Sequence, residues 1–355
     1  MVEWKKLGEI ARRNKGIPIT ARQMSELASS DGNVRVFAAG STIADIDETK
    51  LPKNCAHKLP SIIVKSRGYI DFEFYEKPFT HKNEMWSYSF VNKQEGKFIY
   101  YFLTTKTELF RTKAKANSVK LPQLCVADTD NYLIPIPSLE EQNRIVGILD
   151  TFTASIDNLK GQIAQRRKQY EYYRDQLLDL EGKEGVEMKK LGEACEIRRG
   201  IRVVKKQLKD NALYPVFQNS IAPMGYYDQF NRDGNIPYII CAGSSSGSVG
   251  FCCTPFWAAD DCYTIESSKV NRRYTYYALK KNNNDLFKLV RKGSMPRLPH
   301  EAIDNMIIPI PSLSEQSRIV SILDTFEASI QNLEAQLAQR EKQYEYYRNK
   351  LLTFE

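Results

Sequence analysis

The chain carries a long internal repeat. When residues 134–181 are aligned with residues 308–355, an offset of 174, 35 of the 48 positions are identical. The shared strings include IPIPSL, ILDTF and KQYEYYR, and amphipathic helices that are alike by chance share composition but not identical strings of this length. A shorter match, KKLGE, begins at Lys5 and again at Lys189. The chain is therefore expected to contain two copies of one unit.

Length and composition agree with two domains. A chain of 355 residues is long for one domain and sufficient for two domains with substantial cores. It has no apolar run of about eighteen residues and no basic segment followed by an apolar stretch, so we expect no membrane segment. The seven cysteines form no CxxC pair, which argues against a zinc site and favours a reducing, cytoplasmic location.

Each repeated segment is expected to form a long helix. Ser138 with Glu141, and Ser312 with Glu315, have the S-x-x-E spacing of a capping box at a helix start. The apolar residues that follow are spaced by alternating steps of four and three, which is the heptad seam of a coiled coil. These residues are Ile145, Leu149, Phe152, Ile156, Leu159, Ile163, Tyr170, Tyr173 and Leu177, with Ile319, Leu323, Phe326, Ile330, Leu333, Leu337, Tyr344, Tyr347 and Leu351 in the second copy.

The two helices are expected to pair with each other. A stripe of about 40 residues extends roughly 60 Å at 1.5 Å per residue, which is more than one small domain can cover. The connection at 181–187 is too short to return the chain for a parallel pair, so we expect an antiparallel pair. Such a pair would hold two globular domains apart at a fixed spacing.

The positive charge lies outside the helices. Residues 138–181 and 312–355 carry a net charge of −2 each, whereas the whole chain carries +8, which leaves +12 for the rest. A basic surplus in the globular parts favours an anionic partner, most often nucleic acid. Ordinary solubilising surface charge is the alternative.

The two globular segments, 10–133 and 194–307, resemble each other weakly and in the same order. KLPSIIV at residues 58–64 aligns with NIPYIIC at 235–241, and GYIDF at 68–72 aligns with GSVGF at 247–251. Short β-branched and aromatic runs broken by Gly, Pro and Asn predict mixed α+β domains. Because the helices are nearly identical and the domains have diverged, the helices are expected to share one symmetric task while the domains recognise different targets.

With these features in place, the chain resembles the specificity subunits of type I restriction-modification systems. The resemblance rests on IPIPSLEEQNRIVGILD at 134–150 and its twin at 308–324, on KKLGE, on GSSSGSVGF at 243–251 and on GSMPRLP at 293–299. The first copy departs from the last motif, with ANSVKLP at 116–122. The match covers essentially the whole chain in the order typical of the family.

The resemblance implies an α+β fold with two target recognition domains, at 1–137 and 182–311, and two antiparallel spacer helices, at 138–181 and 312–355, in a pseudo-twofold repeat. It implies sequence-specific binding to double-stranded DNA at a bipartite, asymmetric site. It also implies docking of two adenine methyltransferase subunits and of restriction subunits. S-adenosylmethionine, ATP and Mg would then be cofactors of the partner subunits, with none bound by this chain.

Candidate DNA contacts cluster in two places of each domain. Loops after predicted strands and runs of Lys, Arg and hydroxyl residues suit phosphate and base contacts. The candidates are Lys65, Ser66, Arg67, Arg111, Lys113, Lys115, Asn117 and Lys120 in the first domain, and Ser244, Ser245, Ser246, Ser248, Arg291, Lys292, Ser294 and Arg297 in the second. The Gly/Ser run at 243–248 has an alternative interpretation as a flexible turn. A weaker third set is Arg12, Arg13, Lys15, Arg198, Arg199 and Arg202.

The sequence shows no catalytic constellation. Its three histidines have no metal-ligand spacing, and no methyltransferase or nuclease motif is visible. We therefore expect a non-catalytic reader of DNA. Two other hypotheses remain open: a coiled-coil scaffold whose end domains bind proteins, and a free-standing DNA-binding repressor.

Overall fold

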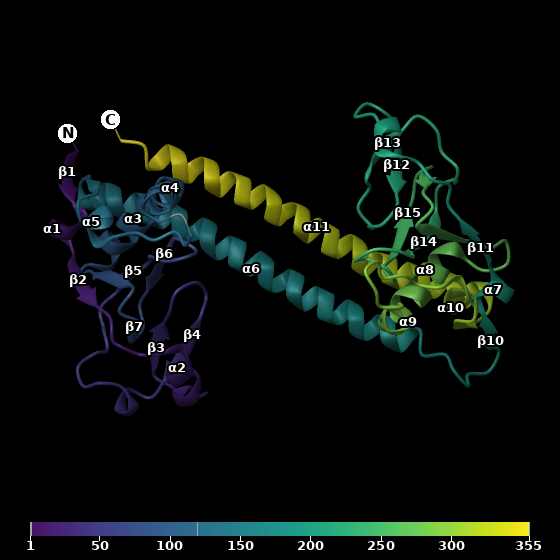
Figure 1. The fold of residues 1–355 in the computed structure, drawn as a ribbon, viewed down its shortest axis with the longest axis horizontal. Coiled ribbons are helices and arrows are strands. Elements are labelled where there is room, and N and C mark those ends of the chain that lie inside the picture. The colour runs from purple at the N-terminus through teal and green to yellow at the C-terminus, as the bar shows by residue number, and fades with distance from the viewer. Residues whose placement is uncertain (1, 119, 355) are drawn as a thin grey trace. The chain divides into compact units, whose positions relative to one another are not determined.

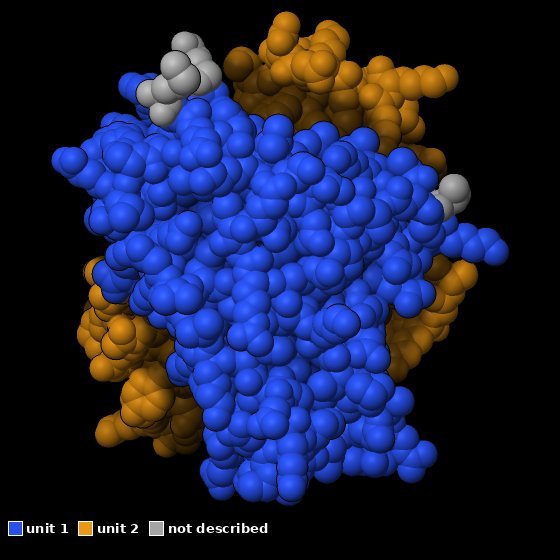
Figure 2. Space-filling view, turned by 90° about the vertical axis from the view of Figure 1, so that its left-hand side faces the viewer, with its two compact units in different colours: residues 1–159, 336–355 blue, residues 160–335 orange. Residues whose placement is uncertain are grey.

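The structure, a computed structural model, describes residues 2–118 and 120–354. The chain divides into two compact units, shown in blue and orange in Figure 2. Unit 1 contains residues 1–159 and 336–355, and unit 2 contains residues 160–335. The two long helices, α6 (Leu139–Leu177) and α11 (Leu313–Leu351), each contribute to both units (Figure 1).

The helix starts differ from the expected capping box in one respect. The Ser138 hydroxyl accepts a hydrogen bond from the Glu141 backbone N–H at 3.3 Å, as the motif predicts. The Glu141 carboxylate, however, binds the Arg144 guanidinium at 2.6 and 2.8 Å, and this pairing lowers the pKa of Glu141. Ser312, Glu315 and Arg318 repeat the arrangement in α11. The glutamate thus stabilises the first turn by an ion pair and by its charge at the helix N-terminus.

The two long helices pair antiparallel, as predicted. In unit 2, Arg167 of α6 meets Glu334 of α11, and Tyr173 stacks on Phe326 with ring centroids 5.4 Å apart, so partner numbers fall as α6 advances. In unit 1, Phe152 of α6 stacks on Tyr347 of α11, also at 5.4 Å. The seam tyrosines therefore pack against the facing helix.

Unit 1 contains three sheets. A two-stranded sheet has the order β1-β9, a four-stranded sheet β2-β8-β5-β6, and a three-stranded sheet β4-β3-β7, in which β3 and β7 are parallel. The strands are β1 (Glu3–Lys6), β2 (Arg12–Lys15), β3 (Val34–Phe37), β4 (Ile43–Ile46), β5 (Ser61–Lys65), β6 (Asp71–Tyr75), β7 (Phe79–His81), β8 (Trp86–Ser89) and β9 (Leu133–Ile136). The shorter helices are α1 (Leu7–Ile10), α2 (Ala21–Leu27), η1 (Glu48–Lys50), α3 (Lys93–Thr104), α4 (Thr107–Asn117) and α5 (Val126–Asp130).

Unit 2 repeats this topology. Its sheets have the orders β10-β18, β11-β17-β14-β15 and β13-β12-β16, and β12 and β16 are again parallel. The strands are β10 (Glu187–Lys190), β11 (Glu196–Arg199), β12 (Tyr214–Phe217), β13 (Gly225–Tyr227), β14 (Ile236–Ile240), β15 (Val249–Cys252), β16 (Trp257–Ala258), β17 (Cys262–Glu266) and β18 (Ile307–Ile310). The shorter helices are α7 (Leu191–Ala194), η2 (Lys205–Gln207), α8 (Arg272–Lys281), α9 (Asn283–Leu289) and α10 (His300–Asp304).

The first turns of each long helix belong to a domain core. Ile145 and Leu149 of α6 are fully buried with residues of β5 and α3, and Ile319 and Leu323 of α11 are buried in the same way in unit 2. The first residues of the apolar stripe thus pack in the domain core, and the later ones pack between the two helices. The predicted fold class, two α+β domains with antiparallel long helices in an internal repeat, is confirmed. No helix within the described residues has the length and apolar character needed to cross a membrane.

Candidate nucleic-acid interface

In unit 1 the first two groups of predicted contacts lie side by side. The turn after β5, residues 65–70, is called here the first glycine turn. Residues 111–123, which are the last turns of α4 and the segment that follows it, are called the first basic loop. Two backbone hydrogen bonds join them, from Leu124 N to Ser66 O and from Gly68 N to Pro122 O, each 2.9 Å long. Gly68 has a φ of 77°, a left-handed conformation that favours glycine.

Unit 2 has the same junction. Residues 241–248, the second glycine turn, are joined to residues 291–297, the second basic loop. The bonds run from Leu298 N to Cys241 O at 2.8 Å and from Gly243 N to Pro296 O at 3.0 Å. Gly243, with a φ of 88°, is thus the counterpart of Gly68, and the sequence alignment of Gly68 with Gly247 is wrong. The error arises because the second turn is longer, with five residues rather than two between its glycine and the next strand.

Two of the predicted hydroxyl contacts are buried. Ser66 is 0% exposed and donates to the Glu84 carbonyl oxygen, and Ser246 is 3% exposed and donates to the Cys241 carbonyl oxygen at 3.0 Å. Both hydroxyls shape the glycine turns, so the prediction that these two side chains contact DNA is wrong. Ser244 is exposed, while Ser245 and Ser248 are half-buried.

Arg111 connects the first basic loop to the first glycine turn. Its Nε donates to the Ile70 carbonyl oxygen at 3.1 Å, its guanidinium lies 4.8 Å from the centroid of the Tyr69 ring, and Glu108 binds it as an ion pair. The Asn117 amide donates to the Gln123 carbonyl and to the Asp128 carboxylate. The remaining predicted contacts of this loop, Lys113, Lys115 and Lys120, are exposed. Val119, inside the ANSVKLP motif, lies outside the described residues.

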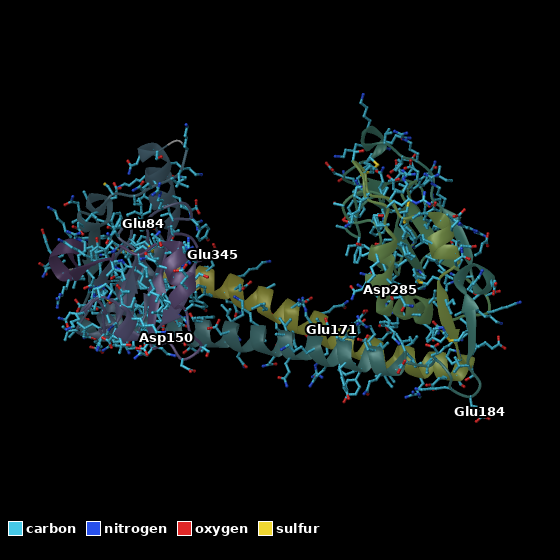
Figure 3. All side chains as sticks on the ribbon, turned by 60° about the horizontal axis from the view of Figure 1, so that its bottom comes forward. Glu84, Asp150, Glu171, Glu184, Asp285 and Glu345 are labelled. Carbon is cyan, nitrogen blue, oxygen red and sulfur yellow. The ribbon has the colours of Figure 1, made fainter. Side chains whose placement is uncertain are left out.

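The first glycine turn carries one exposed and one largely buried cation. Arg67 is exposed, whereas Lys65 is largely buried and lies 2.8 Å from the Glu73 carboxylate. Glu84, labelled in Figure 3, sits beside this turn with Lys82 2.9 Å away. Burial raises the pKa of Glu84, but the bonds from Lys82 and the backbone outweigh it, so its pKa lies below the ordinary value.

The second basic loop is a tight hairpin with an exposed rim. Arg291 and Arg297 exchange backbone hydrogen bonds of 2.9 and 3.1 Å. The Arg297 guanidinium lies 3.6 Å from the Asp261 carboxylate. All four predicted contacts of this loop are exposed: Arg291, Lys292, Ser294 and Arg297.

Five members of the third basic set lie on β2 and β11, each of which is followed by a glycine, and Arg202 lies beyond the end of β11. A Cβ atom on Gly16 would lie 2.3 Å from the Lys82 carbonyl oxygen, and one on Gly200 would lie 2.1 Å from the Ala259 carbonyl oxygen. Only glycine fits this close approach to the three-stranded sheet. Because these glycines follow the repeated KKLGE segment at equal distances, residues of β2 and β11 can be matched one by one.

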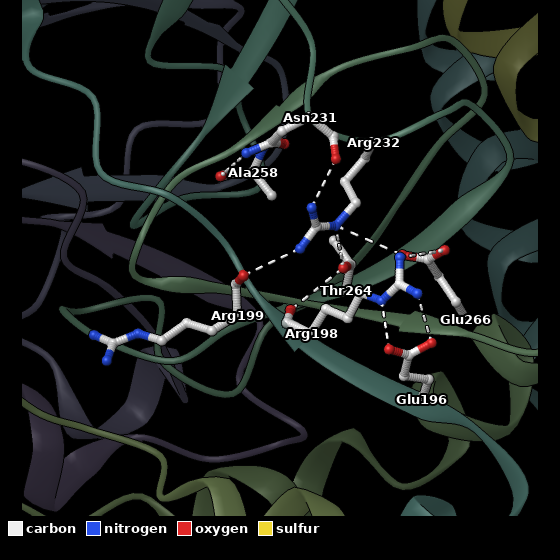
Figure 4. Close-up of polar contacts among 8 residues, drawn as sticks. All are labelled: Glu196, Arg198, Arg199, Asn231, Arg232, Ala258, Thr264 and Glu266. Carbon is white, nitrogen blue, oxygen red and sulfur yellow. Dashed lines mark hydrogen bonds and ion pairs between the residues drawn. The ribbon is translucent and has the colours of Figure 1, made fainter.

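Figure 4 shows that part of this set is internally paired in unit 2. The Arg198 guanidinium binds the Glu196 carboxylate at 2.6 and 2.7 Å. Arg232, whose side chain is only 9% exposed, donates to the Thr264 hydroxyl at 2.7 Å and to the Arg199 carbonyl oxygen at 3.1 Å. Burial lowers the pKa of Arg232. Arg232 therefore connects β11 and β17, and Arg198 pairs with Glu196 on its own strand and with Glu266 of β17 at 3.7 Å.

The counterpart of Arg232 in unit 1 is His57. Backbone bridges pair His57 with Phe79 and Arg232 with Phe256, and the His57 Nε2 lies 3.3 Å from the Lys15 carbonyl oxygen. Lys15 and Arg199 both precede the close-approach glycine, so the two side chains occupy the same place. Sequence reasoning missed this pair because the surrounding strings, CAHKL and FNRDG, share no residue.

The comparisons with known proteins agree with this geometry. The family model described as the type I restriction modification DNA specificity domain matches residues 1–166 and 183–341. A putative type I restriction enzyme specificity subunit of Haemophilus influenzae is 28% identical, covering 99% of this chain and 96% of the relative. The EcoR124I/EcoR124II specificity subunit of Escherichia coli is also 28% identical, covering 99% and 94%.

A solved structure shows the same fold. The crystal structure of a type I restriction-modification S subunit from M. genitalium matches with a TM-score of 0.76 and 18% identity, covering 100% of this chain and 97% of that one. Because the family model spans most of the sequence, the predicted resemblance and the predicted non-catalytic role of a specificity subunit are confirmed. The chain belongs to the type I restriction modification DNA specificity domain family.

Proposed function

We propose that unit 1 and unit 2 each recognise one half of a bipartite, asymmetric DNA site. The observation that carries this proposal is the repeated junction of glycine turn and basic loop, built on equivalent hydrogen bonds but lined by different side chains. Equivalent backbone junctions that carry different polar residues suit a protein that binds DNA in one manner and reads two sequences.

The proposed contacts are the members of the predicted set whose side chains are exposed or partly exposed. Backbone-directed cations position the protein, whereas side chains that reach groove edges select bases. The proposed residues are Lys65, Arg67, Arg111, Lys113, Lys115, Asn117 and Lys120 in unit 1, with Ser244, Ser245, Ser248, Arg291, Lys292, Ser294 and Arg297 in unit 2. In sequence terms we assign the two recognition domains to 1–137 and 182–311 and the two spacer helices to 138–181 and 312–355.

Two copies of a methyltransferase subunit are the proposed partners of the repeated surfaces. Large apolar side chains are exposed at equivalent positions of both units, Trp4, Leu133 and Leu139 in one and Met188, Ile307 and Leu313 in the other. Repeated surfaces of this kind suit two identical subunits. Restriction subunits would join this complex in the cytoplasm, and S-adenosylmethionine, ATP and Mg would be bound by the partners.

A paired substitution tests the division of labour. Arg67→Ala should weaken recognition of one half-site only, and Arg297→Ala of the other, measured by binding to duplexes with each half-site randomised in turn. Equal effects of both variants on both half-sites would contradict the proposal. A coiled-coil scaffold would instead show negligible DNA affinity even at low salt, whereas binding through several phosphates weakens steeply as salt rises.

A further inference from the structure

Unit 1 has a basic hollow that neither the glycine turn nor the basic loop includes. A cavity of about 520 Å³ lies between β2 and the segment that leads from η1 to β5. Five of its lining residues are basic: Arg12, Arg13, Lys15, Lys53 and Lys58. Asn54 on the rim has a left-handed φ of 58°.

For three of these five cations the described residues provide no carboxylate partner. Arg13 lies 3.3 Å from Asp130, and Lys58 lies 3.2 Å from Glu48. Within residues 2–118 and 120–354, no ion pair is formed by Arg12, Lys15 or Lys53, and all three are exposed. Like charges gathered around a concavity raise its positive potential and favour an anion there.

Unit 2 reverses the charge at two of the matching positions and keeps it at a third, where Arg199 takes the place of Lys15. Arg12 and Glu196 are the first residues of β2 and β11, each four residues before its close-approach glycine. His57 is matched by Arg232, but the segment before His57 is longer in unit 1, so Lys53 has no matched residue in unit 2. Lys58 and Asp233 directly follow His57 and Arg232.

In unit 2 the carboxylate at the position of Arg12 is also neutralised, because Glu196 is bound by Arg198. Burial lowers the pKa of His57, which is also among the lining residues of the hollow.

We infer that this hollow is a phosphate site that grips the DNA backbone beside the half-site bound by unit 1, with no counterpart in unit 2. The inference rests on the proposed function and extends it. Arg12, Lys15 and Lys53 would contact phosphate oxygens, which carry no base identity, so the site adds affinity and orientation without changing the recognised sequence. The two halves of the complex would therefore hold DNA with unequal strength.

The test measures how DNA affinity depends on salt. The double variant Arg12→Gln/Lys53→Gln should reduce the slope of log affinity against log salt concentration by about two, since each lost phosphate contact removes about one. The half-site sequences should stay unchanged. The control Lys77→Gln/Lys342→Gln removes two exposed lysines outside the hollow and should leave the slope unaltered. A thermal melt of each variant verifies folding, and Arg12→Lys should retain the wild-type slope.

Three outcomes are decisive. If Arg12→Gln/Lys53→Gln keeps the wild-type salt slope and the sequence preference, the inference that the hollow binds a DNA phosphate is overturned, and the proposed function still stands. A wild-type protein that binds DNA without sequence preference overturns the proposed function itself. If millimolar inorganic phosphate stabilises the wild type but not the double variant, and the DNA slope is the same in both, the hollow binds a small phosphate compound and the inference is overturned.

Discussion

An aspartate in each long helix binds side chains of a shorter helix of the adjoining domain, α3 in unit 1 and α8 in unit 2. Asp150 of α6, labelled in Figure 3, accepts hydrogen bonds from Lys97 at 2.7 Å and from Tyr101 at 2.6 Å. Asp324 of α11 accepts from Arg273 at 2.7 Å and from Tyr277 at 2.5 Å. The aspartate is part of the repeated ILDTF string, so the near identity of the two helices has a structural reason at this position.

Replacing this carboxylate should loosen unit 2. Asp324→Asn removes the charge that faces Arg273, although Glu327 still binds the same guanidinium at 2.6 Å. Hydrogen bonds to charged groups contribute about 1.5–3 kcal/mol, and partial exposure reduces this, so we expect a loss of about 1 kcal/mol in thermal unfolding. The control Asp157→Asn, an exposed position on α6, should have no measurable effect. Equal melting curves for both variants would contradict the anchoring role.

His81 should make unit 1 sensitive to acid. Burial lowers its pKa to about 4, while the ring lies 3.2 Å from the Lys82 carbonyl oxygen and from the Ser87 hydroxyl, with Glu84 and His57 nearby. The unfolded chain binds a proton near pH 6.5 and the folded chain only near pH 4. The stabilisation is therefore complete above pH 6.5 and is lost as the pH falls toward 4, by up to about 1.4 kcal/mol per pH unit.

The measurement is a series of thermal melts between pH 7.5 and 4.5. The wild type should lose more stability over this range than His81→Gln, which lacks the titrating group. His300→Gln, at an exposed position of unit 2, serves as the control and should follow the wild type. Parallel pH curves for the wild type and His81→Gln would refute this account.

At the scale of elements, the heptad spacing of the apolar residues and the identity between the two repeated segments predicted the helices well. The heptad spacing from Phe152 onward and the short connection after α6 were sufficient for an antiparallel pair. The turns could not be aligned correctly from the sequence, because their equivalence depends on backbone hydrogen bonds and these leave no pattern in the side chains. Gly68 matches Gly243 through such bonds, and His57 matches Arg232 although the strings around them share no residue.

The helix pair predicts a change in spacing between half-sites. Seven residues inserted after Ile163 and after Leu337, at equivalent positions of α6 and α11, add two turns and about 10 Å to each helix while the heptad register is kept. We expect the gap between the half-sites to lengthen while both half-site sequences stay the same. Binding assays on duplexes with graded gaps provide the measurement, and an altered half-site would contradict the assignment of spacing to the helices.

At the scale of the whole molecule, the repeat combines two nearly identical helix segments with two diverged domains of equal topology. The strand orders of the three sheets in unit 1 recur in unit 2, although the weak sequence match predicted only a shared order of motifs. Near the glycine turns the two units differ in their polar residues and in loop length. This pattern is what separate recognition by two modules of common origin requires.

Exchange of one domain tests this modularity. Replacing residues 194–307 with the matching domain of a relative should change one half-site and leave the other half-site and the gap unchanged, because the first domain and both helices are retained. Binding selection from a library of duplexes would show the change. A hybrid that alters both halves would contradict independent recognition.

Methylation sequencing of the DNA of cells that carry this chain and its methyltransferase partner tests the central claim most directly. The account predicts methylated adenine in one split, asymmetric sequence, with two fixed half-sites separated by a gap of constant length, and loss of that methylation when the chain is deleted. Methylation at a single continuous sequence, or a pattern that persists without the chain, would contradict it.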